Sequence, residues 1–239
     1  MLQACLNGAR TKSEHPLLPV SAGELAIAAT QAIMAGADEL HIHPRDAEGR
    51  ESILPHDVAS TLKAVRAAVP GVPIGISTGR WIPPLGEERF SVIERWTERP
   101  DYASVNFYED ECIRHIDALA RNGVPIEAGL YSIEDAQLFV TSGCARFAVR
   151  AMIEMTSEDP DEALIEAADI LDILEEAGIG CPVLLHGQEE TTWEMVSEAA
   201  SRGLSTRIGF EDSLYLPDGT MAADNAAMVS AAVGLLARA

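Results

Sequence analysis

The stretch ELHIHPRDAEGRESILPHDVASTLKAVRAAVPGVPIGIS, residues 39–77, contains two short apolar segments with an amphipathic segment between them. Residues 39–43 and 73–77 are predicted as strands. The intervening residues 56–69 are predicted as a helix, because apolar side chains recur there at helical spacing, at Val58, Leu62, Val65 and Val69. A strand, a helix and a second strand in this order form a βαβ unit, in which the two strands lie parallel in one sheet.

The same alternation of strand and helix continues along the whole chain. Further strands are predicted at residues 2–6, 102–106, 126–130, 146–150, 182–186 and 207–211, and further helices at residues 22–35, 87–96, 109–121, 132–141, 160–177, 190–201 and 222–236. Eight such units in 239 residues predict an α/β fold, a single-domain (β/α)₈ TIM barrel over residues 1–239. An open doubly wound sheet is the alternative, but it would more often carry a glycine-rich phosphate turn after the first strand, which Asn7-Gly8-Ala9-Arg10 does not resemble.

Composition excludes several classes of partner. The chain has 38 acidic and 17 basic residues and a net charge of −21, which argues against nucleic acid and against a polybasic membrane patch. No apolar run reaches the roughly 18 residues of a membrane span, and the first residues lack the basic start of a signal peptide. The four cysteines form no CxxC pair. We therefore expect a cytoplasmic protein with reduced thiols.

The strongest motif is His41-Ile42-His43, at the end of a predicted strand. Residues two apart on a strand share a face, so both imidazoles point to the mouth of the barrel. A hydrogen-bonded histidine pair is the alternative to a metal chelate. We favour the metal, because Glu211-Asp212 ends the last predicted strand. Two histidines and a glutamate with an open position are typical of catalytic zinc.

Basic residues also gather near the predicted strand ends, at Arg10, Lys12, Arg45, Arg80, Arg150 and Arg207. Guanidinium groups bind carboxylates bidentately, so the group indicates a small anionic substrate. Pairing with nearby acids such as Asp46 or Glu48 is the alternative for Arg45 and Arg150. Glu14 and His15 are interpreted as loop residues, and His186 is left open between the site and a loop.

Five motifs spread in order along the chain resemble the β-keto acid cleavage enzyme family, whose founding activity is 3-keto-5-aminohexanoate cleavage. They are Asn7-Gly8-Ala9, GADELHIHPRDAEGR at 36–50, Ile76-Ser77-Thr78-Gly79, Ser104-Val105-Asn106, and Arg207-Ile-Gly-Phe-Glu211-Asp212. The resemblance implies a zinc-dependent (β/α)₈ barrel that transfers between a β-keto acid and acetyl-CoA as co-substrate, giving acetoacetate and a new acyl-CoA. It also implies a homo-oligomer, a dimer or a tetramer.

This resemblance assigns residues of the present chain to each part of the active site. His41, His43 and Glu211 hold Zn²⁺ or a similar divalent metal, and Arg207 and Asp212 form the acid–base pair. Substrate-binding residues are expected at Ser77, Ser104, Asn106, Arg10 and Glu127.

Two departures from the family bear on the substrate. Gly129 stands where the family has the glutamate that binds the substrate amine, so an amino-keto acid is disfavoured. Arg10 stands where the founding enzyme has an acidic residue, which indicates a second anionic group, as in 3-ketoglutarate or β-ketoadipate. The segments 151–160 and 186–189 also depart from the family, at loops expected to contact coenzyme A.

Two other functions are weighed against this one. The first is a metal-dependent barrel hydrolase of the amidohydrolase type, but those enzymes carry HxH on the first strand. The second is a non-catalytic metal-bound ligand sensor. The presence of both Arg207 and Asp212 favours an enzyme, because a binding protein needs no pair for proton transfer.

Overall fold

Eight strands form one parallel sheet in the order β7–β6–β5–β4–β3–β2–β1–β8. The computed structural model describes residues 1–238. Its strands are β1 Leu2–Cys5, β2 Glu39–Ile42, β3 Ile74–Ser77, β4 Tyr102–Asn106, β5 Ile126–Leu130, β6 Ala148–Met155, β7 Val183–Gly187 and β8 Thr206–Ile208. The helices that alternate with them are α1 Ala22–Ala35, α2 Pro55–Ala68, α3 Glu88–Glu94, α4 Cys112–Arg121, α5 Ile133–Ser142, α6 Pro160–Glu176, α7 Thr192–Arg202 and α8 Asn225–Leu236.

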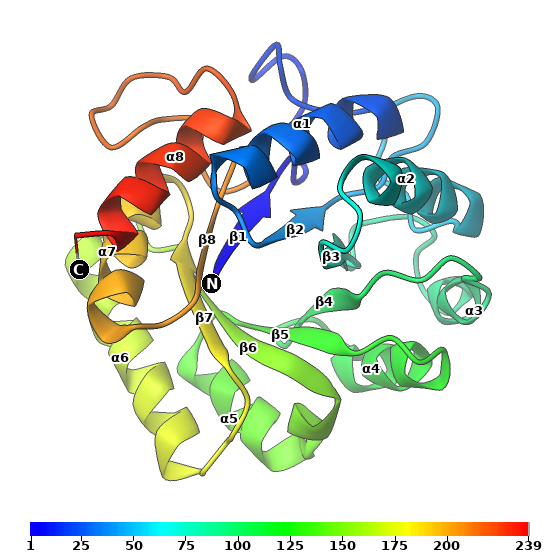
Figure 1. Ribbon diagram of the computed structural model, residues 1–239. Helices are drawn as coiled ribbons and strands as arrows, with labels where there is room; N and C mark the ends of the chain where they lie inside the picture. Colours follow the sequence, from blue (N-terminus) through cyan, green and yellow to red (C-terminus); the bar gives the residue numbers. More distant parts are fainter. Residues whose placement is uncertain (239) are drawn as a thin grey trace.

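The two ends of the sheet meet between β7 and β8, so the sheet closes on itself. Leu184 and Ser205 form a parallel bridge there, and the Leu185 amide donates to the Ser205 carbonyl at 2.9 Å. Figure 1 shows the strands at the centre with the helices around them. The predicted (β/α)₈ barrel is therefore confirmed, and the carboxyl ends of all eight strands lie at one end of it.

Local signals position the helices on the barrel. Ser21 and Glu24 form a capping box at the start of α1, and Gly36 ends that helix with a φ of 116°. Leu25, Ala29 and Ala32 form the buried face of α1. Among the described residues, no helix combines the length and the hydrophobicity that crossing a bilayer requires.

The largest difference from the predicted elements is in β6. The sequence predicts a strand ending at Arg150, but β6 continues to Met155. The reason is that the Arg150 charge does not face solvent: Glu39 and Glu127 pair with it inside the barrel, at 2.5 and 3.0 Å. The end of β6 therefore carries Glu154, and residues 151–155 of the segment expected as a loop are strand. At β8 the strand ends early, so Glu211 and Asp212 lie in the turn that follows it.

Candidate active site

A cavity of about 310 Å³ opens at the carboxyl ends of the strands. Polar side chains from β2, β3, β4, β6 and β8, and from segments that follow the strands, line it. The lining comprises Ala9, Arg10, Glu14, His41, His43, Ser77, Trp81, Ser104, Asn106, Tyr131, Met152, Glu154, Gln188, Glu189, Arg207 and Glu211. The concave shape and the convergent polar groups are those of a small-molecule site.

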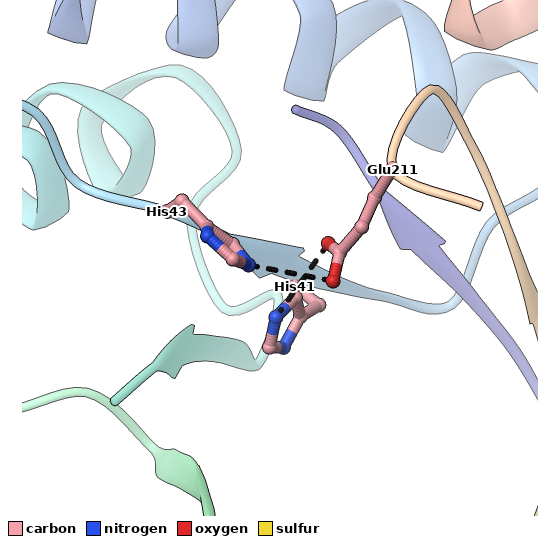
Figure 2. Close-up of side chains that lie close together, drawn as sticks. All are labelled: His41, His43 and Glu211. Atoms are coloured by element: carbon pink, nitrogen blue, oxygen red, sulfur yellow. Dashed lines mark ion pairs between the residues drawn. The ribbon is translucent and has the colours of Figure 1, made fainter. Parts of the chain in front are cut away.

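His41, His43 and Glu211 come together at this cavity. His41 Nε2 lies 3.6 Å from one carboxylate oxygen of Glu211, and His43 Nε2 lies 3.3 Å from the other. Figure 2 shows both imidazoles, carried by β2 and the residue after it, facing the Glu211 carboxylate. One ligand atom from each residue lies within 4.8 Å of the others. The predicted convergence of these three side chains is present in the fold.

The hydrogen bonding of the three residues fits a bound cation. His43 Nε2 and Glu211 Oε2 are buried and have no hydrogen-bond partner in the described part of the chain. A buried polar atom without a partner is costly, and a metal ion would satisfy both atoms. Two imidazole nitrogens and a carboxylate oxygen are also a donor set that Zn²⁺ accepts.

A carboxylate lies behind each imidazole. His43 Nδ1 is 2.6 Å from Glu51 Oε1, while His41 Nδ1 is 3.9 Å from Glu127 Oε2. Burial lowers the pKa of His41 to about 3, so that imidazole is neutral and free to bind a metal. Burial acts in the same direction on His43, but the charges of Glu211 and Glu51 outweigh it and raise the pKa of His43 to about 9.

Arg207 and Asp212 form a buried pair beside the three ligands. Two guanidinium nitrogens donate to the Asp212 carboxylate, at 2.6 and 3.2 Å, and one also donates to Glu211 at 3.0 Å. Burial disfavours the Asp212 carboxylate, but Arg207 and His186 together outweigh that effect and lower the pKa of Asp212. Arg207 lines the cavity, whereas Asp212 lies behind it with no exposed surface.

Ser77, Ser104 and Asn106 line one wall, at the ends of β3 and β4. Gly129 lies next to Asn106, and a Cβ atom on Gly129 would come within 2.7 Å of the Asn106 amide oxygen. The glycine therefore makes room for Asn106. Arg10 also lines the cavity and donates to Glu189 at 2.5 Å and to Glu14 at 3.3 Å.

Glu127 and several expected rim cations lie elsewhere. Glu127 is fully buried and outside the lining, where it pairs with Arg150 below the site.

Arg45 donates to backbone carbonyls of Gly8, Arg10 and Gly49, and Lys12 and Arg80 pair with Glu24 and Asp110. Of the six basic residues expected near the rim, Arg10 and Arg207 alone line the cavity. The pairing alternative is confirmed for Arg150, though its partners are Glu39 and Glu127.

One polar group, on the β5–β7 side of the cavity, was not predicted from the sequence. Glu154 accepts hydrogen bonds from Tyr131 at 2.6 Å and from Gln188 at 2.5 Å. The alternation of β6 gives Glu154 the same face as Arg150, but the strand was predicted to end before it. Glu14, interpreted as a loop residue, also lines the cavity.

His186 and His15 are both buried. His186 lies between Glu154 and Asp212, at 3.4 and 3.5 Å. Burial and Arg207 disfavour its charged form, but Asp212 and Glu154 outweigh them and raise the pKa of His186 to about 8. His15 contacts the Ala222 carbonyl at 3.0 Å and packs on Phe210, so its role is structural.

Comparison with known proteins agrees with the geometry. A relative named 3-keto-5-aminohexanoate cleavage enzyme, from Fusobacterium nucleatum, is 27% identical over 98% of this chain and 90% of its own. A second of the same name, from Acetoanaerobium sticklandii, is 24% identical with the same coverage.

Among solved structures, the ternary complex of ObcA with a C4-CoA adduct and oxalate superposes with a TM-score of 0.75 and 16% identity, over 93% of this chain and 64% of that one. Apo ObcA gives a TM-score of 0.73 over 90% and 61%. The chain thus spans less than two thirds of the length of these ObcA chains, and at this identity they show the fold alone. The model of the beta-keto acid cleavage enzyme family matches residues 1–239. The chain belongs to the beta-keto acid cleavage enzyme family.

Proposed function

We propose that this protein is a zinc-dependent β-keto acid cleavage enzyme. In the proposed reaction a β-keto acid and acetyl-CoA give acetoacetate and a new acyl-CoA. The observation that carries the proposal is the convergence of His41, His43 and Glu211 on a cavity, in a chain that matches the family model over its whole length. A cytoplasmic location and a homo-oligomeric state remain parts of the proposal.

His41, His43 and Glu211 would hold the metal. When bound there, zinc would act as a Lewis acid on the keto group of the substrate. The rest of the reaction depends on side chains of this chain. Ser77, Ser104 and Asn106 present hydroxyl and amide groups to the cavity, and such groups orient the oxygens of a keto acid by hydrogen bonding.

The Arg207–Asp212 pair is the proposed acid–base pair. Its Asp212 carboxylate would take the proton that starts carbon–carbon cleavage. Asp212 has no exposed surface, and it is bonded to Arg207, which lines the cavity. The proposal therefore requires Arg207 to shift when substrate binds, which would bring the carboxylate into contact with the cavity.

Arg10 is the proposed selector for a dianionic substrate such as 3-ketoglutarate or β-ketoadipate. Its guanidinium lines the cavity and is held by Glu14 and Glu189. Both carboxylates are partly exposed, at 42% and 49%, so a substrate carboxylate can compete for Arg10. Gly129 offers no carboxylate for a substrate amine. Since Glu127 lies outside the lining, we do not include it among the substrate contacts.

Coenzyme A is proposed to approach over the β6 and β7 ends. Only residues 156–159 separate β6 from α6, and Gln188 follows β7 directly. These short connections leave that side of the mouth free of a long covering loop. The thioester is expected to meet Gln188 and Glu189, which line the cavity there.

The direct test is turnover. Zinc-loaded protein is mixed with acetyl-CoA and a panel of β-keto acids, and acetoacetate and new thioesters are measured. We expect acetoacetate with at least one dianionic keto acid. If no keto acid is consumed, with or without the thioester, the transferase proposal is wrong.

Replacing one side chain separates this function from a ligand sensor. Asp212→Asn removes the proposed base, and we expect turnover to fall by about 10²–10⁴-fold while zinc content is unchanged. If wild type and variant both bind zinc and the keto acid but neither consumes the keto acid, the protein instead fits the ligand-sensor alternative. Family membership argues against the hydrolase alternative.

A further inference from the structure

One acidic side chain, Glu51, links a proposed metal ligand to the aromatic wall of the cavity. We propose that Glu51 is a positioning residue that holds His43 for the metal with one carboxylate oxygen and holds Trp81 in the cavity wall with the other. This inference rests on the metal site of the proposed function. It adds that metal uptake and the position of Trp81 are linked.

The contacts involve both oxygens of one carboxylate. Glu51 Oε1 lies 2.6 Å from His43 Nδ1, and Glu51 Oε2 accepts from the Trp81 indole N–H at 3.0 Å. Glu51 follows β2 and Trp81 follows β3, so the carboxylate joins two loops of the rim. The Glu51 backbone is itself fixed, because Arg45 and Glu51 form an antiparallel bridge.

The two partners need an acceptor with two oxygens. If His43 Nε2 is to bind a metal, Nδ1 must carry the proton and donate it, and the Trp81 indole nitrogen donates only. A carboxylate accepts from both, one at each oxygen. Glutamine at position 51 would present a single oxygen and an NH₂ group, and the NH₂ group would face a donor. Histidines that bind metals normally donate their second ring N–H to such a partner, which fixes the ring and raises its basicity.

The corresponding contact at the other imidazole is weaker. His41 Nδ1 is 3.9 Å from Glu127 Oε2, beyond hydrogen-bonding distance, and Arg150 shares the Glu127 carboxylate. Of the two carboxylates behind the imidazoles, Glu51 is therefore the one within hydrogen-bonding distance of a proposed metal ligand. Its side chain is 13% exposed, so its interaction with the imidazole is largely shielded from solvent.

Trp81 depends on Glu51 for its place. It lines the cavity although it is 47% exposed, and its ring covers Gly79, where a Cβ atom would come within 2.3 to 2.6 Å of three ring carbons. The indole N–H also donates to Glu51, and this bond anchors the exposed ring. With a metal bound at Nε2, His43 would donate its Nδ1 proton more strongly and would hold Glu51 closer to the imidazole. The same carboxylate would transmit that change to Trp81.

The experiment titrates metal-free protein with Zn²⁺ against a chromophoric chelator and records tryptophan emission at the same points. The variants are Glu51→Gln, Trp81→Phe and the control Glu48→Gln, whose exposed side chain lies on the same loop and pairs with Arg50. We expect Glu51→Gln to raise the zinc dissociation constant by about 10–100-fold, with Glu48→Gln and Trp81→Phe near wild type. The emission change on saturation with zinc should be lost in Glu51→Gln and in Trp81→Phe.

Thermal melting of the metal-free variants separates a loss of zinc from a loss of folding. Wild-type zinc affinity and an intact emission change in folded Glu51→Gln would overturn the inference. So would a loss of zinc in Trp81→Phe as large as in Glu51→Gln, because the His43 contact is unchanged in that variant. The readouts need no substrate: a protein that binds zinc in this way but cleaves no keto acid would sustain the inference and refute the proposed reaction. A wild type that binds no zinc would refute both.

Discussion

Two layers of polar side chains lie inside the barrel, and they behave in opposite ways. In the lower layer Arg150 lies between Glu39 and Glu127, at 2.5 and 3.0 Å, and Gln3 donates to Glu127 at 2.9 Å. In the upper layer His43 Nε2 and Glu211 Oε2 are buried without hydrogen-bond partners and border a cavity. The lower charges compensate one another, whereas the upper groups converge on a space.

The two layers are built from the same strands. Glu39 and His41 are two residues apart on β2, and both point into the barrel. Both residue types are uncommon in a protein core, glutamate more so than histidine. What distinguishes the ligand site from the ion-pair cluster is therefore that its groups border a cavity, whereas the opposite charges of the lower layer face one another across the strands.

The largest expected effect is in the upper layer. His41→Ala removes one of three proposed ligands, and we expect zinc content and turnover both to be lost. Elemental analysis and the acetoacetate assay measure them. His56→Ala is the matched control, because His56 is an exposed residue of α2. Zinc retained in both His41→Ala and Glu211→Ala would contradict the site.

The lower layer should respond in stability instead. Arg150→Met leaves Glu39 and Glu127 without their buried cation, and we expect the free energy of unfolding to fall by about 3–5 kcal/mol. Urea unfolding measures this change, and Arg202→Met, on the surface of α7, is the control. We expect the folded variant to keep its zinc. If Arg150→Met loses zinc without losing stability, then the lower layer does not serve folding separately from the metal site in the upper layer.

Arg10 tests the selectivity of the upper layer. Arg10→Met removes a charge-assisted contact to a second substrate carboxylate, and we expect kcat/KM for a dianionic keto acid to fall by about 10–100-fold. A monoanionic keto acid should be affected much less. Arg80→Met is the control, since Arg80 pairs with Asp110 near the rim outside the lining. Equal losses for both substrates would remove Arg10 as the selector.

His186 gives the smallest effect, and it depends on pH. Its pKa is raised to about 8 from an ordinary value of 6.5, so its charged form stabilises the fold below about pH 6.5 and this stability is lost as pH rises through 8. The full effect is about 2 kcal/mol. We therefore expect the free energy of unfolding to fall between pH 6.5 and 8.5 by more in wild type than in His186→Gln. Identical pH profiles would contradict this.

The fold was predictable because its signals are local. The strands at residues 102–106 and 126–130 and the helix at residues 22–35 have the predicted bounds. The shared face of His41 and His43 follows from strand alternation, while Glu211 was predicted from its place at the end of the last strand and from the resemblance to a known family.

Contacts between loops were not predictable from the sequence. Glu51 meets Trp81 across 30 residues, and neither residue lies in a periodic pattern. The end of β6 was misplaced for the same kind of reason. A charged Arg150 normally marks the end of a buried strand, and its partners, Glu39 and Glu127, are distant in sequence. Pairing inside the barrel is what allows β6 to continue to Glu154.

The most direct test of the account is anomalous diffraction at the zinc edge from crystals of the zinc-loaded protein. The account predicts a single strong peak at the mouth of the barrel, bonded to His41, His43 and Glu211, with the lower layer unchanged. A map with no peak at these three residues, or with the ion bound by other groups, would contradict it.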